Sequence, residues 1–263
     1  MIDTHTHIYL RDDYPDGDER GVQGAVDRAL KSGVSHMVLP CVALDTVEEL
    51  LALHHDNPGV TSVGMGLHPT EVGADWRSEL RAIAERYEDE RPVAIGEVGI
   101  DLYHDATWRE RQMEAFGQQV QLAVERRLPV IIHCREGLDE TLDVLRQFRL
   151  TGLPPLLFHS FTSAPADAER ILSAHPEAMF GINGVVTFKN AQSVRDAVRA
   201  IGLRHIVLET DAPWLAPVPY RGRRNESSYL GAVRDVVATE CGVTPSEAER
   251  LTDENACQLF GIT

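Results

Sequence analysis

The sequence predicts a single α/β domain over residues 1–263, folded as a (β/α)8 TIM barrel. Its 263 residues are close to the typical size of such a barrel. Short apolar segments alternate with longer amphipathic segments from one end of the chain to the other, which favours a parallel sheet. Eight such repeats at this length favour a closed barrel, and an open, doubly wound sheet is the alternative. No change of composition indicates a linker between domains.

The strands are predicted where short apolar segments occur. Residues 130–132, 156–158 and 206–208 are wholly apolar, as expected of strands buried on both faces. The expected strands are residues 1–5, 36–40, 61–66, 92–99, 129–134, 155–160, 178–183 and 205–210.

Amphipathic segments between and after these strands predict helices. Thr107, Ser163 and Asn190 are expected N-caps, and Thr244 followed by Pro245 predicts the start of the last helix. The expected helices are residues 20–32, 43–56, 75–90, 107–128, 138–149, 164–174, 190–202, 226–241 and 245–260.

The composition indicates a cytoplasmic protein with a sizeable core. Apolar residues make up 43% and charged residues 25% of the chain. No apolar segment approaches the length of about 18 residues that spans a bilayer, so no membrane partner is expected. The N-terminus lacks the basic and apolar regions of a signal peptide. The four widely spaced cysteines form no CxxC pair and predict free thiols in a reducing compartment.

The charge is strongly negative. A net charge of −16 weighs against broad, non-specific binding of nucleic acids, because the excess of negative charge repels polyanions. Only Lys31 and Lys189 are lysines among the 25 basic residues. We interpret this acidic, lysine-poor composition as halophilic, because high salt would screen the self-repulsion of the protein. The same screening would permit a nucleic-acid substrate.

Side chains of the metal-ligand types follow six of the predicted strands. They are His5 and His7, His68, Glu97, His133, His159 and Asp211. In a (β/α)8 barrel the C-terminal ends of the strands converge on the face that carries the active site. Burying so many polar groups without partners would be costly, so their convergence predicts a metal site. His5 and His7 are expected to point the same way from an extended segment, which suits chelation of one ion.

Other histidines have a more ordinary interpretation. They lie at the starts of strands or on helices, where a structural or surface role is expected. These residues are His36, His54, His55, His175 and His205.

Two carboxylates are the candidate catalytic residues. Glu97, between Gly96 and Gly99, is expected to bridge two cations, since a buried carboxylate needs such partners. Asp211 is expected to bind one metal and to accept a proton from its activated water. Glu209 lies two residues before Asp211. For Glu209, a structural ion pair is the alternative to a role in the active site.

Substrate-binding residues are expected on the same face. His68 follows the third strand, and Arg135 follows His133 at a spacing that places both on one side. The Pro-rich segment 211–225 carries Arg221 and Asn225 at the active face, where arginine could grip phosphate oxygens. For the neighbouring Arg223 and Arg224, the alternative to phosphate binding is that they belong to a solvated basic turn.

Taken together, the motifs resemble the TatD family of metal-dependent deoxyribonucleases in the amidohydrolase superfamily. The resemblance covers the whole chain in order. It is carried by segments 2–7, 66–69, 95–101, 132–135, 158–161, 184–190, 208–213, 219–226 and 252–261. Departures from the family pattern are Ser160, Ser227 and the sequence Leu102-Tyr103-His104, none of which removes a ligand.

The resemblance implies a (β/α)8 fold and one or two divalent ions, with magnesium, manganese or zinc as candidates. It implies that the ligands are His5, His7, Glu97, His133, His159 and Asp211, with Glu97 bridging. It also implies hydrolysis of phosphodiester bonds at the ends of single-stranded DNA or RNA. Hydrolysis of amide or ester bonds, as in deacylation of D-aminoacyl-tRNA, is the alternative. A monomer is expected.

Overall fold

The computed structural model describes residues 1–15, 21–104, 106–148 and 152–262. Eight strands in the order β1 to β8 form one sheet, and each pairs in parallel with the next strand along the chain. The strands are β1 Ile2–Asp3, β2 His36–Pro40, β3 Thr61–Met65, β4 Ala94–Asp101, β5 Val130–Arg135, β6 Leu156–Phe158, β7 Met179–Ile182 and β8 Ile206–Leu208.

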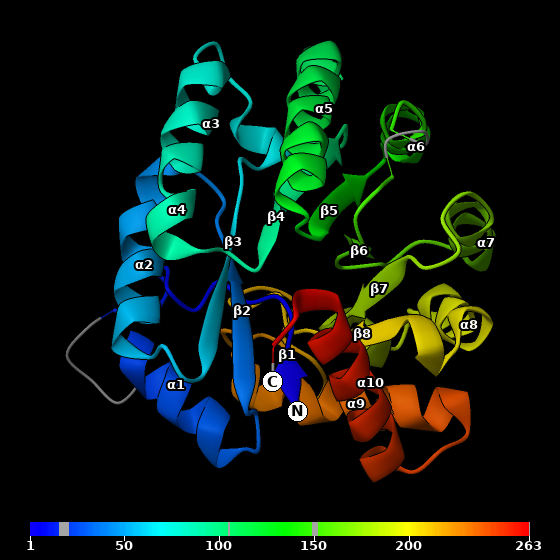
Figure 1. The fold of residues 1–263 in the computed structure, drawn as a ribbon. Coiled ribbons are helices and arrows are strands. Elements are labelled where there is room, and N and C mark those ends of the chain that lie inside the picture. The colour runs from blue at the N-terminus through cyan, green and yellow to red at the C-terminus, as the bar shows by residue number, and fades with distance from the viewer. Residues whose placement is uncertain (16–20, 105, 149–151, 263) are drawn as a thin grey trace.

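Backbone hydrogen bonds join the first and last strands. The N–H of Thr4 donates to the carbonyl of Leu208 at 3.0 Å, and the N–H of Asp211 donates to the carbonyl of His5 at 2.9 Å. The sheet therefore curves back on itself, with helices outside it in chain order (Figure 1). The predicted (β/α)8 barrel is confirmed, and the open sheet is not what the chain forms.

Helices follow the strands on the outside of the barrel. The α-helices are α1 Val22–Lys31, α2 Val47–Asp56, α3 Trp76–Glu85, α4 Tyr87–Glu90, α5 Arg109–Arg126, α6 Leu138–Arg146, α7 Pro165–Ala174, α8 Gln192–Ile201, α9 Leu230–Cys241 and α10 Pro245–Phe260. Short 3-10 turns are η1 Leu44–Thr46, η2 Pro69–Glu71, η3 Ala106–Trp108, η4 Gly184–Thr187, η5 Leu203–His205 and η6 Ser227–Tyr229.

The strands alternate between two cores. Ile131, Leu157 and Val207 belong to an inner cluster, whereas their neighbours Ile132 and Phe158 belong to the larger outer core against the helices. Because side chains alternate with a period of two along a strand, the residue two positions after each inner one faces inward as well. This places the inward face of the strand ends directly above an apolar layer.

Helix α10 covers the other end of the barrel. Its Ala256, Leu259 and Phe260 belong to the inner cluster with the strand residues. Asp253 of the same helix accepts a hydrogen bond from the N–H of Ile2 at 2.8 Å, so the start of β1 lies against α10 (Figure 1). Because apolar side chains fill this end of the barrel, a site made of polar side chains is expected at the opposite end.

Several predicted boundaries are wrong. The strand predicted at 92–99 extends to Asp101, so Glu97 lies inside β4 rather than at its end; the pairing with β5 shifts register between Ile95 and Val98. The positive φ of 135° at Gly96 accompanies this irregularity. The helix predicted at 75–90 is divided into α3 and α4.

The predicted helix caps have a mixed outcome. Thr107, Ser163 and Asn190 are not the capping residues, because the helices begin one residue later, after Trp108, Ala164 and Ala191. Thr244 is confirmed as a cap: its hydroxyl accepts from the N–H of Glu247 at 3.2 Å. Residues 20 and 149, at the limits of two predicted helices, lie outside the described residues.

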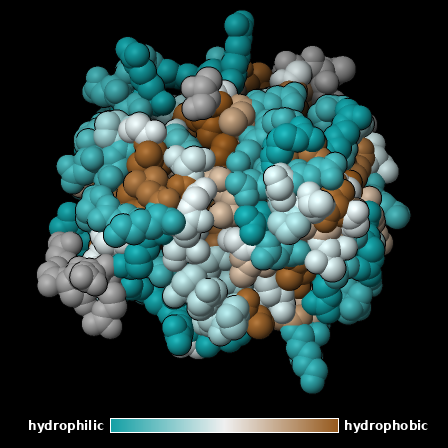
Figure 2. Space-filling view, turned by 90° about the horizontal axis from the view of Figure 1, so that it is seen from below, coloured by the Kyte–Doolittle hydropathy of each residue, from teal (hydrophilic) through white to brown (hydrophobic). Residues whose placement is uncertain are grey.

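Within the described part of the chain, no helix is both long and apolar enough to cross a membrane. The face drawn in Figure 2 is mostly hydrophilic, and its hydrophobic residues form small, separate patches.

Candidate metal centre

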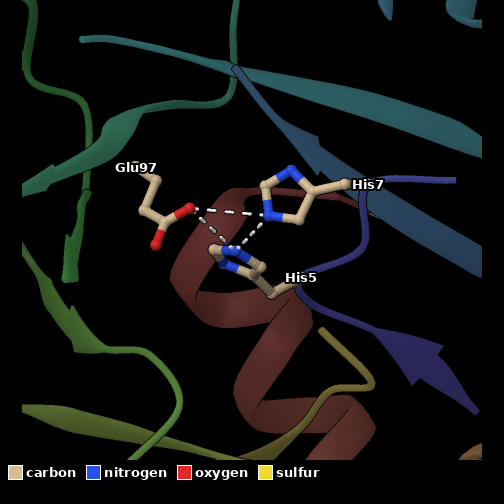
Figure 3. A group of neighbouring side chains, drawn as sticks. All are labelled: His5, His7 and Glu97. Atoms are coloured by element: carbon tan, nitrogen blue, oxygen red, sulfur yellow. Dashed lines mark hydrogen bonds and ion pairs between the residues drawn. The ribbon is translucent and has the colours of Figure 1, made fainter. Parts of the chain in front are cut away.

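His5 and His7 meet Glu97 at the mouth of the barrel (Figure 3). The Nε2 atoms of the two histidines lie 3.0 Å apart, as expected if both rings point the same way from an extended segment. Oε2 of Glu97 is 3.3 Å from Nε2 of His5 and 3.5 Å from Nε2 of His7. All three side chains are buried.

The second oxygen of Glu97 faces a different group of histidines. Oε1 lies 2.7 Å from Nε2 of His159, 2.9 Å from Nδ1 of His133 and 3.3 Å from Nε2 of His68. His133 and His159 reach this point because they follow the inward-facing Ile131 and Leu157 by two residues. The carboxylate of Glu97 therefore lies between two clusters of imidazoles, one on each oxygen.

Asp211 completes the first cluster from β8. Its Oδ1 lies 3.8 Å from Nε2 of both His5 and His7. Its side chain is 13% exposed, compared with 5% for Glu97. Asp211 has a positive φ of 57°, a backbone strain that turns the chain at the end of β8. This carboxylate is thus the one in the cluster that is most open to solvent.

Hydrogen bonds fix which nitrogen of His7 faces the cluster. The hydroxyl of Tyr9 donates its only hydrogen to the carbonyl of Pro40 at 2.7 Å, so it accepts from Nδ1 of His7 at 3.1 Å. In the neutral form of the ring, Nε2 of His7 is then the nitrogen with the lone pair, and it faces His5 and Glu97. A neutral imidazole held in this way is the form that binds a metal.

A buried carboxylate fixes His133 in a similar way. Oδ2 of Asp101 lies 2.9 Å from Nε2 of His133, while Nδ1 of the same ring faces Glu97. Asp101 also accepts from the backbone N–H groups of Tyr103 and His104, at 3.0 and 2.9 Å. Burial would raise the pKa of Asp101, but the hydrogen bond from His133 and those from the backbone and side chain of His104 hold it below its ordinary value. Asp101 is therefore an ionised anchor for the ring.

Glu209 occupies the corresponding place beside His159. Its Oε1 accepts from the N–H of Ser160 at 2.6 Å and lies 3.5 Å from Nδ1 of His159. A Cβ on Gly181 would come within 1.9 Å of Oε2 of Glu209, so the absence of a side chain at position 181 leaves room for the carboxylate. The proposed ion pair of Glu209 thus has a defined partner at the back of a candidate ligand.

The electrostatics of the cluster favour positive charge at its centre. Burial would raise the pKa of Glu97, but the charges of His159, His68 and His5 hold it well below its ordinary value. Burial would lower the pKa of His159, yet the charges of Glu97 and Glu209 raise it well above the usual range. Ring nitrogens of three histidines lie close to Oε1 of Glu97. Their lone pairs would repel the carboxylate, so either these nitrogens carry protons or a cation lies among them.

The donor set fits a divalent metal ion. Among the described residues, three groups have ligand atoms within 4.8 Å of one another: His5, His7 and Glu97; His68, Glu97 and His133; and His5, His159 and Glu209. Imidazole nitrogens combined with carboxylate oxygens suit zinc, manganese, iron or nickel, and carboxylates also suit magnesium. The six residues predicted as ligands lie close together, and the carboxylate of Glu97 lies between the two groups of histidines.

The predicted substrate residues are placed less uniformly. His68 lies among the candidate ligands, with Nε2 3.2 Å from Nδ1 of His133. Arg135 is exposed and its guanidinium stacks on Tyr103 at 4.0 Å. Arg221 stacks on Phe188 at 3.9 Å at the rim of the mouth.

The structure corrects the expectation for Asn225. This residue is fully buried, and its Nδ2 donates to the carbonyls of Thr210 at 2.8 Å and Trp214 at 2.6 Å. Its Oδ1 accepts from the N–H of Glu226 at 2.9 Å. The amide is thus used within the loop, where Asn225 braces the segment after β8.

Sequence reasoning missed Asp101, and it also missed Asp3. Asp3 is fully buried and accepts from the N–H and hydroxyl of Thr210, at 2.9 and 2.6 Å. Burial raises the pKa of Asp3 to about 7. Its position two residues before His5 was the available signal, because side chains at this spacing share a face. Asp3 thereby ties the end of β1, just before the His-x-His pair, to the segment that carries Asp211.

Comparisons with known proteins agree with this geometry. A family model described as TatD related DNase matches residues 2–261. An Escherichia coli K12 protein named uncharacterized metal-dependent hydrolase YcfH is 32% identical over 267 residues, covering 100% of this chain and 96% of that protein. The 3'-5' ssDNA/RNA exonuclease TatD of Erwinia amylovora is 33% identical over 243 residues, covering 90% of this chain and 92% of that protein.

A solved structure gives the same answer for the fold. The TatD homologue YjjV of Escherichia coli K12 superposes with a TM-score of 0.87 at 27% identity, covering 100% of this chain and 98% of that one. The family match thus extends over nearly the whole chain and includes every candidate ligand. The chain belongs to the TatD-related DNase family.

Proposed function

We propose that this protein is a divalent-metal-dependent phosphodiesterase that removes nucleotides from the ends of single-stranded DNA or RNA. The observation that carries the proposal is the position of Glu97, whose two oxygens face two separate clusters of histidines. Two adjacent cations held in this way suit displacement at phosphorus, where the attacking and leaving oxygens both need stabilisation. The relative from Erwinia amylovora, named an exonuclease of ssDNA and RNA, supports the same substrate class.

The candidate ligands divide between two positions. His5, His7, Asp211 and Oε2 of Glu97 would hold one ion. His133, His159 and Oε1 of Glu97 would hold the other, with His68 beside it. Magnesium, manganese and zinc are the candidate ions, and when bound they would supply Lewis acidity and lower the pKa of a coordinated water.

Asp211 is the proposed proton acceptor. It is the carboxylate of the cluster with the greatest exposure, so it can meet a water that enters from the open mouth. Asp101 and Glu209 are fully buried behind His133 and His159, where they orient rings and cannot reach the solvent. Glu97 would contribute to catalysis by holding the two groups of candidate ligands, and so the two ions, at a fixed separation.

Arginines at the rim are the proposed phosphate contacts. Arg135 and Arg221 each stack on an aromatic ring, which fixes the plane of the guanidinium while leaving it at the surface. A planar guanidinium offers paired donors that match two phosphate oxygens. In a chain with a net charge of −16, cations at the mouth would guide an anionic substrate to the site.

We also propose a cytoplasmic monomer, made of one domain and adapted to high salt. The surface arginines pair with carboxylates, as in Arg86 with Glu48 at 2.6 Å and Arg250 with Glu254 at 2.8 Å. Self-repulsion of the acidic surface should be reduced by screening. The midpoint of urea unfolding should therefore rise as potassium chloride is added, and sedimentation equilibrium should give the monomer mass. An unchanged midpoint, or a dimer, would contradict these statements.

The proposed activity is tested with end-labelled single-stranded DNA and RNA. Each substrate is incubated with the protein and magnesium, manganese, zinc or EDTA, in dilute buffer and in high salt. Asp211→Asn should abolish nucleotide release, whereas the matched surface variant Asp143→Asn should retain it, because Asp143 is exposed on α6. A folded, metal-loaded protein that cleaves neither substrate would refute the proposal and direct attention to amide or ester bonds.

A further inference from the structure

Trp214 is an exposed aromatic side chain beside the candidate metal centre. Its exposed fraction is 49%, and its ring lies 5.3 Å from the ring of His7, measured between centroids, at an interplanar angle of 60°. His7 is one of the two imidazoles that face Oε2 of Glu97. A half-exposed indole thus contacts the ring of a candidate metal ligand.

The other tryptophans are buried or have a ring face covered by a guanidinium. The chain has three tryptophans. Trp76 is 1% exposed, and the ring face of Trp108 is covered by the guanidinium of Arg111 at 3.9 Å. No arginine or lysine covers Trp214 among the residues that the structure describes, and its contact with His7 is edge-to-face. One face of an indole therefore remains available for stacking.

Hydrogen bonds anchor the backbone of Trp214 at both of its polar groups. Its N–H donates to the carbonyl of Asp211 at 3.0 Å, and its carbonyl accepts from Nδ2 of the buried Asn225 at 2.6 Å. Asp211 and Trp214 are therefore fixed relative to each other by the same short segment. A platform that is already ordered loses little conformational entropy when a ligand stacks on it.

The surroundings of Trp214 match a nucleotide. The same segment carries Arg221 and Arg223, which are exposed and positively charged, while the metal centre would take the phosphodiester. Proteins that bind single strands combine cationic groups along the backbone with aromatic rings on which bases stack. A sugar-phosphate chain alone would not need an indole at this place.

We infer that Trp214 is the stacking platform for the nucleobase of the nucleotide whose phosphodiester is cleaved. The inference rests on the proposed function and adds its substrate preference. A base inside a duplex is stacked between its neighbours, so only an unpaired strand can present its base to Trp214. Stacking of this kind corresponds to a preference of about 5- to 100-fold for a nucleotide that carries a base. It should depend weakly on which base is present, because every base has a π-face.

The experiment compares two single-stranded DNA oligonucleotides that differ only in their terminal nucleotides. One carries bases throughout, and the other has an abasic tetrahydrofuran residue at both ends. The quantity measured is kcat/KM for release of the first nucleotide by the metal-loaded protein. The wild-type protein should prefer the base-bearing oligonucleotide by about 5- to 100-fold. Trp214→Ala should lose the preference, whereas Trp214→Phe and the control Trp108→Ala should retain it.

Fluorescence provides a readout that does not require turnover. In the Trp108→Phe variant, Trp214 is the exposed indole of the described chain, since Trp76 is buried. A phosphorothioate oligonucleotide that resists hydrolysis should quench this fluorescence when it carries bases, and its abasic counterpart should not.

The outcomes separate the inference from the function on which it rests. Equal rates on both oligonucleotides, from an active wild-type protein, would overturn the inference and leave the nuclease activity in place. A Trp214→Ala variant that binds metal more weakly and slows both substrates equally would show that Trp214 only supports His7, which also overturns the inference. Absence of cleavage together with absence of quenching would refute both.

Discussion

Asp101 holds the ring of His133 from the side opposite Glu97. Its Oδ2 lies 2.9 Å from Nε2 of His133, and Nδ1 of the same ring lies 2.9 Å from Oε1 of Glu97. A carboxylate behind a ligating histidine fixes both the tautomer and the orientation of the ring. The imidazole is therefore aligned before any ion arrives.

Replacing Asp101 should weaken metal binding at one of the two positions. We expect Asp101→Asn to lower the affinity for manganese by about 10- to 100-fold at the position of His133 and His159. Isothermal titration of the metal-free protein measures this change. The control Asp143→Asn, on the exposed face of α6, should bind as the wild type does. An unchanged affinity in Asp101→Asn would show that the ring is oriented by other contacts.

Much of this centre could be predicted from the sequence. The apolar Ile131 and Leu157 identify the inward face of their strands, and two residues later the same face presents His133 and His159. The parallel βα pattern then brings these strand ends together. The ligand types were therefore predictable, because they depend on local alternation and on a regular architecture.

The remaining features depend on contacts between distant segments. Glu97 lies within β4, where the pairing with β5 shifts register. The alternation of apolar and polar residues in the sequence does not predict this shift. Asn225 was expected to face a substrate, yet the folding of its loop turns the amide onto the backbone of Thr210 and Trp214. The pairing of Glu209 with His159 likewise depends on the spacing between β6 and β8, which lie on either side of β7. Such outcomes follow from tertiary packing, which local patterns do not encode.

The bridging position of Glu97 predicts a difference in metal stoichiometry. We expect Glu97→Gln to weaken both sites, because each oxygen of the carboxylate faces its own group of histidines. His7→Ala should weaken only the site formed with His5 and Asp211. Metal analysis after dialysis against limiting free manganese would give the number of ions retained by each variant. Loss of a single ion in Glu97→Gln would contradict a bridging role.

Gly181 and Glu209 should be coupled in their effects on stability. A Cβ at position 181 would lie 1.9 Å from Oε2 of Glu209, and the three nearest atoms all belong to that carboxylate. We expect Gly181→Ala to lower the free energy of unfolding by about 1–3 kcal/mol through overpacking.

A double-mutant cycle isolates this contact. In a Glu209→Ala background the added methyl group has room, so Gly181→Ala should cost much less there. Urea unfolding of the four metal-free proteins in EDTA provides the values. Equal costs of Gly181→Ala in both backgrounds would show that the clash involves the backbone of β7 rather than Glu209.

Two histidines far from the metal centre predict how stability depends on pH. Nε2 of His36 lies 2.8 Å from the hydroxyl of Ser62, and Nδ1 of His54 lies 2.9 Å from the hydroxyl of Thr61. Burial lowers the pKa of both histidines below the ordinary value of 6.5. The folded state therefore binds fewer protons than the unfolded state once the pH is below about 6.5. The stability that these groups contribute is present above pH 6.5 and is lost as the pH falls through the lowered pKa values of the folded state.

We expect the double variant His36→Gln, His54→Gln to lose less stability than the wild type between pH 7.5 and pH 5. Glutamine can still bond to the hydroxyls of Ser62 and Thr61, but it does not take up a proton in acid. Urea unfolding at each pH, in EDTA, gives the free energies. The remaining histidines are the same in both proteins, so their titration cancels in the difference. Parallel losses of stability in the two proteins would show that the half-buried rings at the start of β2 and the end of α2 do not cause the acid sensitivity.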